Sequence, residues 1–201
     1  MIRVGLTGGM ACGKSYVART LQGFGCHVVS ADELGHEVLL PGCEAYDGVV
    51  NLFGRDILDE RGRINRKRLA AHVFDSPERL QQLNAIVHPA VIRRQEEFLQ
   101  QAEQLDPKGI GIVEAAILIE TGSYKRFKKL IVVVCTPEEQ VQRAVERDGC
   151  TPDQARARLN RQMPVEEKRR YADYVIDTSG SKERTLEQTK DVYEALRSLE
   201  R

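Results

Sequence analysis

Residues 8–15 read GGMACGKS, a complete G-x-x-x-x-G-K-S pattern that follows the β-branched run Ile2 to Leu6 directly. Glycines in such a stretch let successive backbone N–H groups point into one concavity, where a phosphate group fits. The helical stretch from Tyr16 to Gln22 adds the positive end of its dipole. The pattern predicts a phosphate-binding loop, or P-loop, with these ATP-binding residues: Gly9, Met10, Ala11, Cys12, Gly13, Lys14 and Ser15.

Two side chains of the loop have expected roles of their own. Lys14 should reach the β- and γ-phosphates as a catalytic group, and Ser15 should be a ligand of Mg²⁺ bound with ATP. A chance match in a chain of this length is expected on the order of one time in a hundred. Cys12 is either a small side chain whose backbone matters or a reactive thiol near a helix N-terminus.

Short β-branched runs alternate with longer amphipathic segments over the rest of the chain, which is typical of a parallel sheet covered by helices. We therefore predict an α/β protein with a P-loop, in three α/β/α layers around a five-stranded parallel sheet. The predicted strands are Ile2–Leu6, Cys26–Val29, Ile110–Val113, Leu130–Cys135 and Tyr174–Ile176.

Two long excursions interrupt this pattern. Residues 34–108 contain no convincing strand and are predicted to be a helical substrate-binding insertion, with separate helices starting at Pro77 and at Pro89. Residues 140–170 are helical in period, rich in arginine and predicted to form a small lid. The chain should thus be a single domain over 1–201. Its core segments are 1–33, 109–139 and 171–201.

Composition excludes several classes of function. The 201 residues hold 30 Lys and Arg against 30 Asp and Glu, so no net field favours nucleic acid. No apolar run approaches the ~18 residues that span a membrane, and no signal-peptide layout is seen, which favours a cytoplasmic protein. Five cysteines without metal-site spacing favour reduced thiols. We expect a monomer or weak homo-oligomer.

One carboxylate follows the second predicted strand, at Asp32. The carboxyl ends of parallel strands open onto one crevice, so Asp32 is expected to face the P-loop and to accept a proton from an attacking hydroxyl. Alternatively, Asp32 only complements the dipole of a helix capped by Ser30. The absence of a guanine-reading N-K-x-D sequence favours a small-molecule kinase over a GTPase.

Further markers give the chain a resemblance to the dephospho-CoA kinase family along nearly its whole length. They are Val4 to Gly9, Ala31-Asp32 with His36, Asn84 to Pro89, Arg161 to Pro164, Lys168, and Ala172 to Asp177. The resemblance implies phosphorylation of the ribose 3′-hydroxyl of dephospho-CoA by Mg-ATP, the last step of coenzyme A synthesis, with Asp32 as general base. Other acceptors, such as a nucleoside monophosphate or a small alcohol, and a non-catalytic ATP-binding switch remain the alternatives.

The chain departs from the family pattern at two places. Ser30 stands where the family commonly has a first Asp, while the second acid is kept as Asp32. The segment after the third strand reads EAAILIE over 114–120 and lacks the family's proline at position 116. Without that proline the backbone before Ile117 is less restricted.

Four more residues complete the predicted site. Arg143 and Arg147 are one helical turn apart and are candidate catalytic cations, with solvated helix charges as the alternative. His88 either contacts the substrate's phosphate or caps a helix. Glu114 either holds a water on the metal, orients Lys14 or forms an ordinary ion pair. We predict that His88 and Glu114 are both substrate-binding residues.

Overall fold

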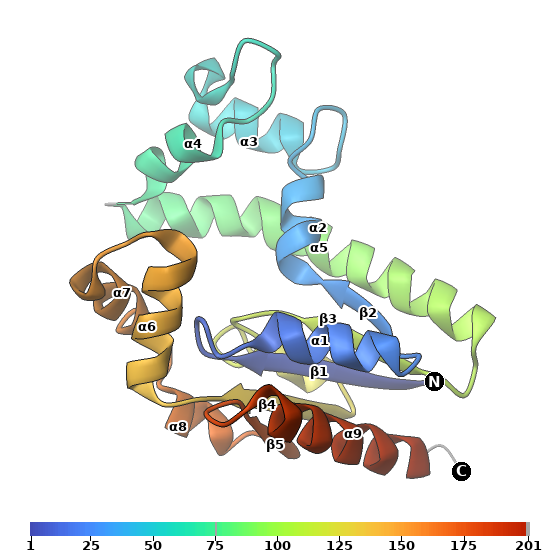
Figure 1. The fold of residues 1–201 in the computed structure, drawn as a ribbon. Coiled ribbons are helices and arrows are strands. Elements are labelled where there is room, and N and C mark those ends of the chain that lie inside the picture. The colour runs from blue at the N-terminus through green and yellow to red at the C-terminus, as the bar shows by residue number, and fades with distance from the viewer. Residues whose placement is uncertain (75, 200–201) are drawn as a thin grey trace. The chain divides into compact units, whose positions relative to one another are not determined.

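The computed structural model describes residues 1–74 and 76–199 (Figure 1). The chain divides into two compact units. One joins Met1–Ser30 to Leu99–Arg201 and contains the sheet, and the other comprises Ala31–Phe98 and is helical. No helix among the described residues is long and apolar enough to cross a membrane.

The sheet has the predicted five parallel strands. Five parallel strands pair in the order β2-β3-β1-β4-β5, so the P-loop strand β1 lies at the centre between β3 and β4. The strand register aligns Leu6 with Glu114 and Thr7 with Val132, so the carboxyl ends of β1, β3 and β4 lie at one edge of the sheet. The bounds are β1 Ile2–Gly8, β2 His27–Ser30, β3 Ile110–Glu114, β4 Lys129–Val134 and β5 Tyr174–Asp177.

Helices α1 (Lys14–Gly23) and α9 (Lys182–Ser198) cover one face of the sheet and pack side by side. Alternate residues of β1, Ile2, Val4 and Leu6, point to this face and are almost completely buried. Because strand side chains alternate with a period of two, this one set forms the main core with the helices.

The opposite face is covered by three different segments. Added Cβ atoms at Gly5 and Gly111 would meet Leu118 and Leu99 respectively, so the segment after β3 and the end of α5 (Pro77–Leu105) pack there closely. Helix α8 (Val165–Arg169) contacts β4. The predicted three-layer α/β/α fold is confirmed.

Helices α6 (Pro137–Asp148) and α7 (Pro152–Leu159) lie between β4 and β5 in the chain. Each begins with a complete capping box, made by Thr136 with Glu139 and by Thr151 with Gln154. These boxes satisfy backbone N–H groups that a helix start otherwise leaves without a partner, which explains the sharp helix starts.

The helical unit has its own small core. Val49, Phe53, Ile57 and Leu69 are buried, and they bring together helices α3 (Tyr46–Phe53) and α4 (Arg66–Val73) with the 3₁₀ turn η1 (Arg55–Ile57). Helix α2 (Ala31–Glu37) starts directly after β2, and a second 3₁₀ turn, η2 (Ser123–Arg126), precedes β4 in the other unit.

The prediction of separate helices from Pro77 and from Pro89 is wrong. Helix α5 is continuous over Pro77–Leu105 and carries Pro89 in its interior. A proline removes one backbone hydrogen bond, but the buried side chains Ala90, Val91 and Leu99 hold the following turns in place. His88 therefore lies inside a helix, and the capping alternative for it is removed.

Candidate active site

The P-loop connects β1 to α1 and has the backbone that its glycines permit. Gly13 has φ +78°, in the left-handed region that glycine adopts without strain. A Cβ at Gly8 would lie 2.3 Å from the carbonyl oxygen of Val133, so only glycine fits between β1 and β4. The backbone angle at Gly13 and the lack of space at Gly8 explain why the pattern requires glycine at these two positions.

Ala11 is the one described residue other than glycine with positive φ, at +57°. Such a conformation costs about 1 kcal/mol and is found where a functional loop is held by its surroundings. The ammonium of Lys14 donates to the carbonyl oxygen of Gly9 at 3.1 Å and so lies over the same loop. The predicted loop is thus formed and curved as a phosphate concavity requires.

Ser15 and Glu114 meet at the carboxyl edge of the sheet. The Ser15 hydroxyl donates to Glu114 Oε1 at 3.0 Å, and Glu114 is the last residue of β3, level with Leu6 of β1 and Ser30 of β2. A hydroxyl beside a carboxylate is an oxygen donor set that suits a hard divalent cation, which takes its other ligands from phosphates and water. The described residues hold no group of three or more His, Cys, Asp and Glu side chains that could bind a metal alone. A divalent cation held by this pair would take its remaining ligands from outside these two residues.

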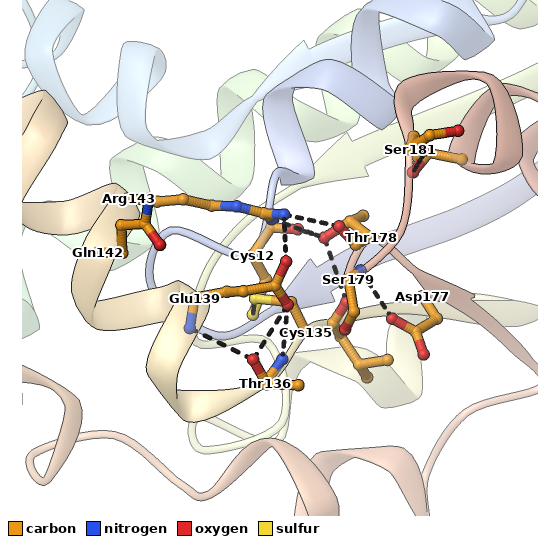
Figure 2. A network of polar contacts seen from close by, with 12 residues as sticks. Cys12, Cys135, Thr136, Glu139, Gln142, Arg143, Asp177, Thr178, Ser179 and Ser181 are labelled. Carbon is orange, nitrogen blue, oxygen red and sulfur yellow. Dashed lines mark hydrogen bonds and ion pairs between the residues drawn. The ribbon is translucent and has the colours of Figure 1, made fainter.

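Arg143 is joined to the P-loop through Thr178 (Figure 2). The guanidinium donates to Thr178 Oγ1 at 2.9 Å and to the Thr178 carbonyl at 2.7 Å, and it pairs with Glu139 at 3.0 Å. The Thr178 hydroxyl in turn donates to the carbonyl oxygen of Cys12 at 2.9 Å. This network brings a cation of α6 beside the loop.

Arg147 has different surroundings. Its guanidinium forms a bidentate ion pair with the neighbouring Asp148, with N–O distances of 2.8 and 3.1 Å. The Arg147 side chain is 61% exposed. The hydrogen bond from Arg147 lowers the pKa of Asp148. Of the two predicted arginines, Arg143 is thus the one with contacts that lead to the P-loop.

The backbone of Met10 is held by two glutamines that were not among the predicted site residues. Gln140 Nε2 donates to the Met10 carbonyl at 2.8 Å, and Gln162 Oε1 accepts from the Met10 N–H at 3.0 Å. Gln140 lies on α6 and is almost completely buried, while Gln162 follows α7. The loop is therefore fixed from two separate parts of the predicted lid segment.

Lys168, a marker of the family resemblance, makes contacts that no sequence pattern predicted. It lies on α8, is completely buried, and its ammonium donates to the Ala116 carbonyl at 2.7 Å and reaches the Gly8 carbonyl at 3.5 Å. Glu120 supplies its counter-charge at 2.8 Å. The side chain joins α8, the start of the P-loop and the segment after β3.

A pocket of about 990 Å³ lies between α6, α7 and residues 162–166, and Gly9 and Cys135 form part of its wall. Apolar side chains make up much of the lining, among them Val141, Val145 and Met163. The pocket therefore extends from the predicted lid segment to Gly9 of the P-loop.

Comparisons with known proteins agree on the family. The family model described as dephospho-CoA kinase matches residues 2–184. The Aquifex aeolicus dephospho-CoA kinase is 44% identical over 196 residues, which cover 98% of each chain. The chain belongs to the dephospho-CoA kinase family. It is therefore an enzyme of that kinase family, and as a P-loop kinase it uses ATP.

Solved structures show the same likeness to the family's fold. A crystal structure of a Thermus thermophilus protein is 34% identical, with a TM-score of 0.85 over 96% of both chains. The dephospho-CoA kinase from Campylobacter jejuni is 27% identical, with a TM-score of 0.70 over 98% of this chain and 97% of that one.

Two predicted family residues, Asp32 and His88, belong to the helical unit. Asp32 is the second residue of α2, two positions after Ser30 at the end of β2. His88 lies within α5. Their roles remain predictions, whereas the P-loop, Ser15, Glu114 and Arg143 lie together in the sheet unit.

Proposed function

We propose that the protein transfers the γ-phosphoryl group of ATP to the ribose 3′-hydroxyl of dephospho-CoA, giving coenzyme A and ADP in the final step of coenzyme A synthesis. Family membership supports the choice of acceptor. The observation that carries the chemistry is the contact between Ser15 and Glu114 at 3.0 Å beside a curved P-loop. Together they support a single site for the ATP phosphates and a cation.

The loop residues 9–15 would bind the ATP phosphates through their backbone N–H groups, and Lys14 would place its charge on the β- and γ-phosphates. Ser15 would hold Mg²⁺, with Glu114 on a water or on the ion itself. Magnesium bound there would supply positive charge for the phosphate oxygens. Lys14, which donates to the Gly9 carbonyl at 3.1 Å, would exchange this contact for a phosphate oxygen when ATP binds.

Asp32 is proposed as the general base that takes the proton of the ribose hydroxyl. Its support is the position directly after β2, because the carboxyl ends of parallel strands are where ligands of such sheets bind. An attacking hydroxyl is a weak nucleophile until its proton has an acceptor. A carboxylate at this point of the chain gives that acceptor.

Arg143 and Arg147 are proposed as cations for the transferred phosphoryl group. Arg143 has the stronger support, since its guanidinium is already linked to Cys12 of the loop through Thr178. A planar guanidinium suits phosphate oxygens because it offers two parallel donors. His88 and Glu114 are proposed to contact the acceptor side of the site.

The parts of the chain are proposed to divide this work within a single domain over 1–201. Residues 34–108 would bind dephospho-CoA, residues 140–170 would form a lid that excludes water, and the remaining core would hold ATP. A monomer or weak homo-oligomer in the cytoplasm, acting on small molecules, completes the proposal.

The test is ADP release by the purified protein with Mg-ATP, comparing dephospho-CoA with AMP, adenosine and no acceptor. We expect turnover that depends on dephospho-CoA and a product heavier by one phosphate. Turnover with AMP or adenosine instead would assign another acceptor. ATP binding without any acceptor-dependent ADP would leave the nucleotide-binding switch as the function.

A further inference from the structure

Two thiols lie in contact beneath the P-loop (Figure 2). Cys12 belongs to the loop and Cys135 follows β4, and their sulfur atoms are 3.4 Å apart although 123 positions separate them in the chain. Both are buried and neither is bridged. A disulfide requires sulfur atoms at about 2.05 Å, so the two need to approach by about 1.4 Å.

The environment of the pair favours reaction between its members. The hydrogen bond from the Cys135 thiol lowers the pKa of Cys12, and the charge of Lys14 lowers it further against the effect of burial. The same hydrogen bond raises the pKa of Cys135. Of the two thiols, Cys12 is therefore the one that loses its proton more readily, and the thiolate is the reactive form in thiol chemistry.

A route to the pair is also present. Cys135 forms part of the wall of the 990 Å³ pocket between α6, α7 and residues 162–166, whereas Cys12 is completely buried behind it. A small neutral oxidant that enters the pocket therefore meets Cys135 first. Cys12 is then the sulfur that completes the reaction.

The geometry points to a modification site: we propose that Cys12 and Cys135 are a dithiol that peroxides oxidise to a disulfide, which reversibly weakens ATP binding. The site of modification itself does not depend on the acceptor, while its effect on ATP rests on the proposed function of the P-loop.

The reaction balances with hydrogen peroxide as the oxidant. The Cys135 sulfur attacks one peroxide oxygen, the O–O bond breaks, and the leaving oxygen takes up the proton of the Cys135 thiol and departs as water. The Cys12 sulfur then attacks the sulfenic acid on Cys135, and the hydroxyl group leaves with the Cys12 proton as water. The two sulfurs together lose two electrons, and the two peroxide oxygens gain them.

The disulfide would act on the loop through Cys12. The Cys12 carbonyl accepts from Thr178, and its N–H donates to the Gly9 carbonyl at 3.4 Å, so movement of Cys12 disturbs both contacts. Ala11 next to it already has a left-handed backbone that its surroundings must hold. Loss of one charge-assisted hydrogen bond to phosphate is enough to weaken ATP binding about tenfold.

The experiment treats the reduced, full-length protein with hydrogen peroxide. Free thiols are then alkylated, the digest is mapped by mass spectrometry, and ATP binding is titrated before and after dithiothreitol. We expect a linked peptide pair containing Cys12 and Cys135, ATP binding weaker by about tenfold or more, and recovery after reduction. Excess Mg-ATP during treatment should slow the linkage, because bound phosphates hold the loop.

Variants at two positions serve as controls. Cys135→Ala should bind ATP as the parent does and keep that affinity after peroxide, with Cys135→Ser as a second choice if the alanine variant folds poorly. Cys150→Ser removes a partly buried thiol outside the pair and should respond as the parent does. Peroxide-treated parent without the linked peptides would overturn the site. If peroxide lowers the ATP affinity of Cys135→Ala as much as that of the parent, the proposed effect of the disulfide on the loop is overturned.

Peptide mapping needs no turnover, so this outcome is separate from the test of the acceptor. An enzyme inactive with dephospho-CoA can still form the linkage and lose ATP affinity. Conversely, an active enzyme that never forms the linked peptides contradicts only the dithiol.

Discussion

The ammonium of Lys168 lies 2.8 Å from Glu120 Oε1, although the lysine side chain is completely buried. The Ala116 carbonyl and the more distant Gly8 carbonyl also surround this ammonium. A buried ammonium is stable only when charge and hydrogen bonds replace its lost water. The pair thus ties α8 to the segment after β3 at the start of the P-loop.

Glu120→Gln should destabilise the protein by about 3 kcal/mol, because it leaves the Lys168 charge buried without its carboxylate. Urea unfolding of parent and variant measures this difference. The matched control is Glu194→Gln, which opens the exposed pair of Lys190 and Glu194 and should change stability by less than about 1 kcal/mol. Equal effects of the two changes would contradict the importance of burial.

Gln140→Glu and Gln162→Glu should differ in how much stability they cost, although both changes are isosteric. The first change places a carboxylate against the Met10 carbonyl in a buried position and should cost about 2 kcal/mol of stability. The second keeps an oxygen that accepts from the Met10 N–H and should cost less. Thermal unfolding and KM for ATP measure both. A larger KM in Gln162→Glu without loss of stability would instead indicate charge repulsion of the phosphates.

Asp32→Asn should lower kcat by about 10²- to 10⁴-fold, the range of general base catalysis, with ATP binding nearly unchanged. The measurements are kcat with dephospho-CoA and titration of ATP binding. Asp47→Asn, in the first turn of α3, is the control and should keep its activity. Undiminished turnover in Asp32→Asn would remove Asp32 from the role of base.

Arg143→Lys should reduce kcat more than Arg147→Lys does. Lysine cannot reproduce the fork that joins Arg143 to both oxygens of Thr178, whereas Arg147 is largely exposed and contacts its neighbour Asp148. We expect about a tenfold or larger difference between the two kcat values. The reverse order would mean that Arg147 changes its contacts when the nucleotide binds.

Asp173 should contribute stability that depends on pH. Burial opposes its ionisation, but hydrogen bonds from Lys129 and from the Leu130 N–H outweigh this and lower its pKa. Because the folded pKa lies below the unfolded one, this stability is present above about pH 4 and is lost as pH falls through the folded pKa.

The measurement for Asp173 compares unfolding free energies of the parent and Asp173→Asn at about pH 7, 4 and 2.5. The difference between the two proteins should be largest at neutral pH and should shrink in acid. Asp153→Asn is the control, since Asp153 is almost completely exposed, and it should show little difference at any pH. A difference for Asp173→Asn that grows in acid would contradict the sign of the shift.

Much of the fold could be predicted because its signals are local. The five strands lie within about two residues of their predicted bounds, and the capping boxes of Thr136 and Thr151 start α6 and α7 as expected. The P-loop was recognisable because the local backbone conformation of the loop requires glycine at fixed positions, and local requirements leave a pattern in the sequence. Pro89 misled the prediction, since its effect on α5 depends on what packs around the helix.

The sequence alone determined the α/β class, the P-loop with Lys14 and Ser15, and the resemblance to the family. Only the tertiary structure decided that Lys168 is buried against Glu120, that Gln140 and Gln162 hold Met10, and that Cys12 meets Cys135. The physical reason is that patterns report interactions between near neighbours in the chain. Contacts such as residue 12 with residue 135 exist because β1 and β4 pair side by side in the sheet, and no local pattern records that pairing.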